Sequence, residues 1–268
     1  MKRFYVGHIH ADFVSMNDAI DIVCRAAMAQ SAGFVVTPNV DHVVLAERNA
    51  ALRNAYESAM LSLADGMPLI WASRLFGHPL PGKISGSDLV APLLARAAQE
   101  RLRVYFLGAA PGVGTIAAEA AVRRYPGLQI VGVDAPPLGF ERDSAQEAAT
   151  KEKMLAASPD IAFVALGCPK QEILMHRWSR EAGMPVMLGI GASLDFLAGK
   201  VRRAPPTLSR LGLEWLFRLT QDPIRLAKRY LVRDMAILPI LARMALHPRG
   251  PIVHCDERTT IGVETAAE

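Results

Sequence analysis

The chain has 268 residues, of which 51% are hydrophobic, so it is long enough to bury a full core as one large α/β domain with or without an appendage. Its three cysteines, at positions 24, 168 and 255, are far apart and odd in number. This spacing argues against a disulfide framework and against a metal site with paired cysteine ligands.

Charge is distributed unevenly along the chain, although the net charge is only +4. Residues 1–199 hold 18 Lys and Arg against 19 Asp and Glu, whereas residues 200–250 hold 11 against three, and residues 251–268 hold one against four. The basic segment predicts an anionic partner, either a phosphate-bearing ligand, a membrane surface or nucleic acid. Few aromatic residues and no nucleic-acid motif argue against nucleic acid.

The N-terminal residues form a strand-like run that contains His8, His10 and Asp12 and lacks an apolar signal core. Together with the cysteine usage, this predicts a cytoplasmic protein. The predicted organisation is an α/β core over residues 1–199, a basic helical appendage over 200–250, and an acidic, disordered tail over 251–268.

Apolar strand-like runs alternate with helical patterns through the core, which is typical of a doubly wound, mainly parallel sheet flanked by helices. The predicted strands are 34–37, 60–63, 104–107, 129–133, 161–166 and 186–190. The predicted helices between them are 17–30, 40–57, 88–101, 113–124, 146–156 and 171–182.

Polar side chains follow several of these strands. Asp65 ends the run 60–64, precedes Gly66 and lies three residues before Pro68. Ligands of parallel α/β sheets bind beyond the carboxyl ends of the strands, so this carboxylate is a candidate catalytic group. The commoner role, a cap on the next helix, stays open on this residue alone. The other polar side chains after strands include Thr37, Asn39, Lys170 and Gln171.

A glycine pattern follows the strand 104–107. Gly108 ends it, and residues 112–117 match the GxGxxG/A pattern, whose backbone N–H groups can hold a diphosphate. Asp134 lies 22 residues after Gly112, where a carboxylate can meet a ribose hydroxyl. An NAD-dependent oxidoreductase is therefore an alternative, although the match begins four residues after Gly108.

Metal and nucleophile chemistry have little support in the sequence. No HExxH, CxxC or Asp-x-Asp motif is present, and His42 beside Asp41 is more often a capped or solvated residue than a catalyst. Cys168, in a turn before Pro169, is a candidate nucleophile without an evident histidine partner.

The basic segment predicts two amphipathic helices, 207–220 and 224–245, with Arg225, Lys228 and Arg229 on one face. Its last apolar stretch, 235–246, is too short to span a bilayer, which takes about 20 residues, but it can lie on a membrane. An ordinary helical subdomain with a solvated basic face explains the same pattern, and a non-catalytic basic adaptor that binds lipid remains a further alternative.

Several motifs, in this order, resemble those of the WecG/TagA/CpsF glycosyltransferases over about residues 4–233. These are residues 37–39 (TPN), 64–66 (ADG), 86–89 (GSDL), 167–172 (GCPKQE), 203–205 (RAP) and 212–219 (GLEWLFRL). The resemblance implies an inverting enzyme that transfers a sugar from a UDP donor to a polyprenyl-diphosphate-linked sugar on the cytoplasmic membrane face. It also implies that the appendage docks on the membrane and helps to form the site.

By this resemblance Asp65 is the general base, no cofactor is needed, and Thr37, Asn39 and Gln171 orient substrate hydroxyls. Without an Asp-x-Asp pair to hold a metal, arginines of the appendage would stabilise the departing UDP, with Arg210, Arg218, Arg225 and Arg229 as candidates. Members often carry Arg where this chain has Lys83. The donor sugar (N-acetylmannosamine, its uronic acid, glucose or another), the acceptor, the polymer and any homo-oligomer stay open.

Overall fold

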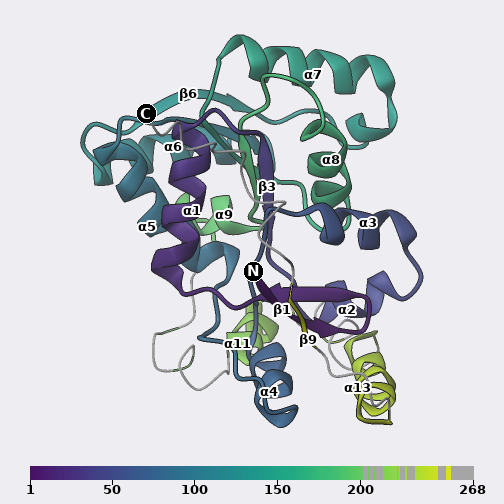
Figure 1. Cartoon of the computed structure of the whole chain (residues 1–268). Helices are drawn as coiled ribbons and strands as arrows, with labels where there is room; N and C mark the ends of the chain where they lie inside the picture. The colour runs from purple at the N-terminus through teal and green to yellow at the C-terminus, as the bar shows by residue number, and fades with distance from the viewer. Residues whose placement is uncertain are drawn as a thin grey trace, which may run out of the picture.

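The computed structural model describes residues 1–201, 214–221, 233–246 and 252–254, together with residues 205, 208, 223 and 227. Six parallel strands form the central sheet in the order β4-β3-β8-β7-β5-β6 (Figure 1). These strands are β3 (Gly33–Val36), β4 (Leu61–Ser62), β5 (Arg103–Gly108), β6 (Gln129–Asp134), β7 (Ile161–Ala165) and β8 (Val186–Gly189). Each overlaps one predicted strand, so the predicted doubly wound parallel sheet is confirmed.

Helices cover both faces of this sheet, which completes the doubly wound fold (Figure 1). One hydrophobic layer is built by α1 (Met16–Met28), α5 (Gly86–Gln99), α6 (Val113–Arg124) and α9 (Ser193–Leu197). The other is built mainly by α2 (Val40–Ala46), α3 (Ala50–Ser58), α4 (Met67–Leu75), α7 (Ser144–Ala156) and α8 (Lys170–Trp178). The strand side chains alternate between the two layers: Phe106 and Phe163 contact in the first, and Tyr105 and Val164 lie in the second.

The single helix predicted over 40–57 is two helices, and the residues between them supply the reason. Asn49 is the N-cap of α3, where its side chain accepts a hydrogen bond from the backbone N–H of Leu52 at 3.0 Å. Arg53 donates to the carbonyl oxygens of Ala46 and Glu47 at the end of α2. Both sets of end groups are therefore satisfied, and the apolar periodicity alone did not reveal the break.

A second, three-stranded sheet joins the N-terminal hairpin to residues 252–254. The hairpin of β1 (Lys2–Val6) and β2 (Ile9–Asp12) pairs antiparallel with β9 (Ile252–His254) through β1. The Asp12 side chain accepts the backbone N–H of Ser62 at 2.8 Å, which ties this sheet to β4. Residues 252–254 of the predicted acidic tail thus belong to a sheet, and residues 255–268 lie outside the described residues.

The described parts of the basic segment are helical, namely α11 (Glu214–Gln221), the short 3-10 helix η3 (Asp234–Ala236) and α13 (Ile237–Leu246). Two ion pairs attach this part to α2: Arg233 Nε lies 2.6 Å from Asp41 Oδ1, and Arg243 Nη2 lies 2.7 Å from Glu47 Oε1. Ile240 is buried in the hydrophobic layer that also contains residues of the β1–β2 hairpin. Among the described helices, none has the length and apolar character needed to cross a bilayer.

Candidate active site

The candidate site lies where four neighbouring strands end at one edge of the sheet. In parallel sheets the loops beyond the carboxyl ends form the ligand crevice. Adjacent strands β4, β3, β8 and β7 deliver, in that order, Asp65, the Thr37–Asn39 turn, the Gly191 turn and the Gly167–Gln171 turn. Segments far apart in sequence therefore meet at this edge: Thr37 and Gly189, for example, are 152 residues apart.

Asp65 lies in the turn between β4 and α4. Its backbone N–H donates to the Pro38 carbonyl at 2.8 Å, which holds it beside the turn that carries Thr37 and Asn39. The N-cap of α4 is Gly66, at φ +119°, a backbone conformation that favours glycine. Asp65 is therefore not the N-cap residue of α4, and it is half-buried.

Thr37 and Asn39, which follow β3 at this edge of the sheet, both have hydrogen-bond partners in the protein. Thr37 is buried, and its hydroxyl lies 3.4 Å from the carbonyl oxygen of Gly189, at the limit of a hydrogen bond. Asn39 caps α2 by accepting the N–H groups of Asp41 and His42 at 3.0 and 3.4 Å. Asn39 therefore shapes the turn through its side-chain oxygen.

Gln171 is the most tightly held of the predicted residues. It is 2% exposed; its Oε1 accepts the N–H groups of Gly167 at 3.1 Å and Gly191 at 3.2 Å, and its Nε2 donates to Glu172 Oε1 at 2.8 Å. A Cβ on Gly189 would lie 2.8 Å from Nε2, so the glycine makes room for this amide. The side chain thus clamps the turns after β7 and β8 to each other.

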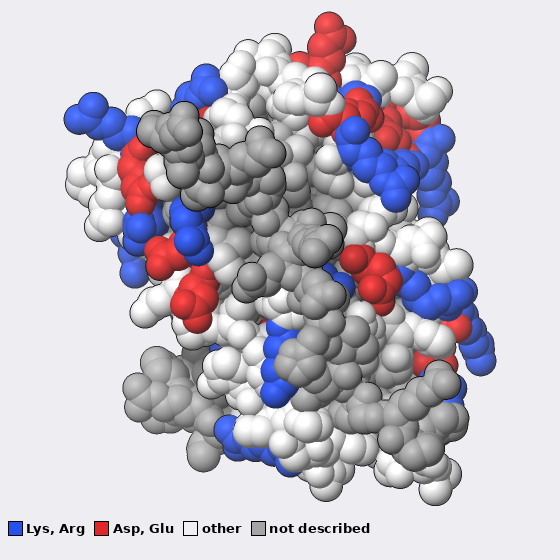
Figure 2. Space-filling model, viewed as in Figure 1, with Lys and Arg blue, Asp and Glu red and all other residues white. Residues whose placement is uncertain are grey.

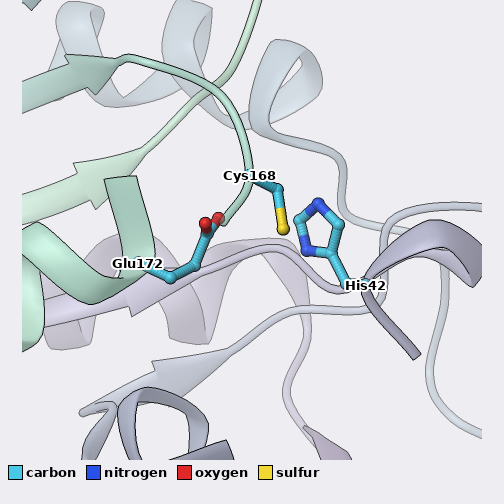
Figure 3. A group of neighbouring side chains, drawn as sticks. All are labelled: His42, Cys168 and Glu172. Carbon is cyan, nitrogen blue, oxygen red and sulfur yellow. The ribbon is translucent and has the colours of Figure 1, made fainter. Parts of the chain in front are cut away.

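A polar cluster that the sequence did not reveal includes a residue of the turn after β7. His42 of α2, Cys168 of the turn after β7 and Glu172 of α8 face one another (Figure 3), and His42 Nδ1 lies 2.6 Å from the Tyr56 hydroxyl. Burial raises the pKa of Tyr56 well above its usual value, and the charges of Glu172, Cys168 and Asp65 raise it further. Cys168 therefore has a histidine neighbour after all, contrary to the sequence interpretation.

Three further predicted substrate contacts, Gly108, Asp134 and Lys170, have contacts within the described part of the chain. Gly108 ends β5 at φ +98°, and a Cβ there would lie 2.6 Å from the Ala165 carbonyl oxygen, so packing explains this glycine. Asp134 ends the edge strand β6 and pairs with Lys153 at 2.6 Å. Five strand spacings separate β6 from β4, roughly 24 Å, so Asp134 cannot contact the atoms on which Asp65 would act. Lys170 pairs with Glu141 at 3.0 Å.

The four arginines predicted to stabilise the leaving group cannot be placed. Arg210, Arg225 and Arg229 lie outside the described residues, and only the backbone of Arg218 is described, in α11. What the structure does place is Arg233, which the sequence interpretation did not select. It pairs with buried Asp41, two residues after Asn39, so the basic segment reaches α2 next to the crevice.

A parallel sheet that carries a carboxylate among polar turns at its carboxyl edge is typical of α/β enzymes that bind a ligand beyond the strand ends. Comparison with known proteins identifies the family within this class. The model described as "Glycosyl transferase WecG/TagA/CpsF family" matches residues 4–250, and the chain belongs to this family of glycosyltransferases.

Two curated relatives carry the same printed name, N-acetylglucosaminyldiphosphoundecaprenol N-acetyl-beta-D-mannosaminyltransferase. The protein from Bacillus spizizenii is 34% identical over 221 residues, which cover 82% of this chain and 79% of the relative. The protein from Bacillus subtilis (strain 168) is 30% identical over 212 residues, covering 79% and 80%. The family resemblance based on the motifs is confirmed, and both comparisons favour a glycosyltransferase over an oxidoreductase or an adaptor.

Proposed function

We propose that this protein is an inverting glycosyltransferase that moves N-acetylmannosamine from a UDP donor to a polyprenyl-diphosphate-linked N-acetylglucosamine, for a bacterial surface polysaccharide. The observation that carries the proposal is the arrangement of Asp65 beside the Thr37–Asn39 turn, in a member of this family. The names of the two Bacillus relatives support the sugar and the acceptor.

Asp65 acts as the general base in this proposal. Its carboxylate takes the proton of the acceptor hydroxyl while that oxygen attacks the anomeric carbon from the face opposite the diphosphate. The bond between the anomeric carbon and the diphosphate oxygen breaks, and the electron pair leaves with UDP. One base is sufficient for this single displacement, because no covalent enzyme intermediate has to form and break.

The leaving diphosphate needs positive charge, and the basic segment supplies it in this proposal. Guanidinium groups bind a diphosphate through paired N–H donors, and they act best where water is excluded. The contact of Arg233 with Asp41 supports the idea that this segment covers the crevice. Transfer should therefore proceed at an unchanged rate when magnesium and manganese are omitted from the assay.

The proposal is tested by combining donor binding with product formation. UDP and UDP-N-acetylmannosamine should raise the melting temperature by binding the native state, and NAD should not. Incubation with the donor and a polyprenyl-diphosphate N-acetylglucosamine should then yield a disaccharide product by mass spectrometry. Stabilisation by NAD without UDP would support the oxidoreductase alternative, and donor binding without transfer to any lipid-linked acceptor would remove the proposed reaction.

The proposed location is the cytoplasmic face of an anionic membrane, where a lipid-linked acceptor is available. Helices α4, α11 and α13 lie at one end of the molecule, the lower end in Figure 1. In Figure 2 the lowest part of the described surface carries apolar or neutral and basic atoms. Exposed apolar side chains on these helices and on η3 include Trp71, Leu75, Trp215, Leu216, Met235, Leu238 and Leu246.

The α4 helix offers the sharpest test of this docking face because it belongs to the core. Trp71 and Leu75 are 51% and 76% exposed and lie four residues apart on one side of the helix. Replacing both by Gln should weaken binding to phosphatidylglycerol vesicles in co-sedimentation by about 10²-fold, since inserting each side chain into the interface is worth about 1.5 kcal/mol. Melting temperature should hardly change.

The matched control replaces Ile116 and Val122 of α6 by Gln. These side chains are 41% and 46% exposed but lie on a helix at the opposite end of the molecule (Figure 1). Equal loss of vesicle binding in both double variants would show general hydrophobic adhesion and would contradict docking through α4.

A further inference from the structure

The cluster of His42, Cys168 and Glu172 offers three different ligand atoms at one point (Figure 3). A ring nitrogen, a thiol sulfur and a carboxylate oxygen all lie within 4.8 Å of one another. His42 and Glu172 are 6% and 0% exposed, and Cys168 is half-buried. The cluster therefore has two buried members and one that is partly exposed.

Glu172 provides a second, independent indication of a missing partner. Its Oε1 accepts from Gln171, but its Oε2 is buried and makes no hydrogen bond of ordinary geometry within the described part of the chain. The polar group beside the carboxylate is the Cys168 thiol, which is only a weak donor. A buried carboxylate oxygen with so little compensation is costly, and a bound cation would remove that cost.

Tyr56 gives His42 the support that a metal-binding histidine needs. Its hydroxyl lies 2.6 Å from Nδ1 and fixes the plane of the ring. Metal-bound histidines are commonly held by a hydrogen bond to a ring nitrogen. Gln171 holds Glu172 similarly, through the bond to Oε1. Two of the three side chains are thus pre-oriented.

We propose that His42, Cys168 and Glu172 bind one zinc-like divalent transition-metal ion beneath the candidate active site. The mixed nitrogen, sulfur and oxygen set suits zinc, whereas magnesium and calcium prefer sites made of oxygen atoms alone. Zinc bonds of about 2.0–2.3 Å place tetrahedral ligands roughly 3.3–3.8 Å apart, so small rotations of these side chains complete the geometry. Three protein ligands leave a fourth position for water.

The ion would connect α2 to the turn between β7 and α8. His42 lies in the first turn of α2, three residues after Asn39, and Cys168 and Glu172 flank the turn that Gln171 clamps. Its role is to hold these turns together, which is separate from the diphosphate chemistry assigned to the basic segment. The proposed metal site therefore does not depend on the proposed reaction, and each can be tested separately.

The test uses the full chain after removal of bound metal by a chelator. Titration with Co²⁺ should give one equivalent of binding, with visible ligand-field bands and a near-ultraviolet thiolate-to-cobalt absorption, and Zn²⁺ should displace it. Cys168→Ser should abolish the thiolate absorption. Glu172→Gln should weaken Co²⁺ binding at least about tenfold, because the variant loses a charged ligand. Zinc should raise the melting temperature of the wild-type chain more than that of Cys168→Ser or Glu172→Gln.

Cys24→Ala is the matched control, because Cys24 is a free cysteine of α1 in the opposite hydrophobic layer. Its thiolate absorption and stoichiometry should equal those of the wild-type chain. The proposal is wrong if the wild-type chain shows no thiolate-to-cobalt absorption, or if the absorption survives in Cys168→Ser. Cys168→Ser replaces a single atom, so it should fold even if Glu172→Gln proves unstable. Circular dichroism checks the folding of both variants.

Discussion

Asp65→Asn should reduce the rate of sugar transfer by about 10²–10⁴-fold, the usual contribution of a general base. Asn has the shape of Asp but cannot accept the proton of the acceptor hydroxyl. The backbone bond from residue 65 to the Pro38 carbonyl persists in the variant, so the turn keeps its conformation. We expect the melting temperature and the affinity for UDP to stay close to those of the wild-type protein.

Asp143→Asn is the control for this variant. Asp143 caps α7 by accepting the N–H groups of Ala145 and Gln146, and Asn caps helices as well as Asp does. Transfer by this variant should be unchanged. A fully active Asp65→Asn enzyme would refute the assignment of the base, and a loss of UDP binding equal to the loss of rate would indicate a role in donor binding.

Gln171→Ala should cost stability and activity together, because it removes three hydrogen bonds inside the protein. The N–H groups of Gly167 and Gly191 and an oxygen of Glu172 would lose their partner. Each unsatisfied buried group costs about 1–3 kcal/mol, so we expect a loss on the order of 3 kcal/mol or more after relaxation and entry of water. Chemical denaturation measures this loss, and kcat should fall as the turns separate.

Gln146→Ala provides the comparison, since Gln146 is an exposed amide whose Nε2 donates to Asp143. Its replacement should change the free energy of unfolding by less than about 0.5 kcal/mol. The two roles proposed for Gln171 are then separable. If Gln171 orients substrate hydroxyls, as the sequence interpretation proposed, and has no structural role besides, Gln171→Ala will raise KM and leave the free energy of unfolding unchanged.

The fold was predictable because the sequence patterns that indicate its strands and helices are local. Short apolar runs such as residues 161–165 are buried on both faces, and they alternate with periodic helices that end at glycine and proline turns. The break between α2 and α3 escaped this reasoning, because Asn49 and Arg53 act on helix ends without interrupting the apolar pattern. The pairing of β9 with β1 escaped it for another reason: the partners lie about 250 residues apart.

The candidate site was predictable only in part. Polar residues that follow buried strands fall at one edge of the sheet, so the sequence could point to Asp65, Thr37 and Gln171. The family motifs then suggested a role for each of them. Asp134 met the same rule, yet the strand order puts it at the far edge of the sheet. Strand order depends on how crossovers pack, which a run of strands and helices does not encode locally.

By itself, the sequence determined the class of the fold, the family and the segregation of positive charge into residues 200–250, and it selected Asp65 as the candidate base. Only the tertiary structure decided that Gln171 is a clamp, that Cys168 meets His42, and that Arg233 joins the basic segment to α2. The reason is physical. Residue type and spacing specify local backbone and burial, whereas contacts between distant side chains depend on strand order and on the turns that bring them together.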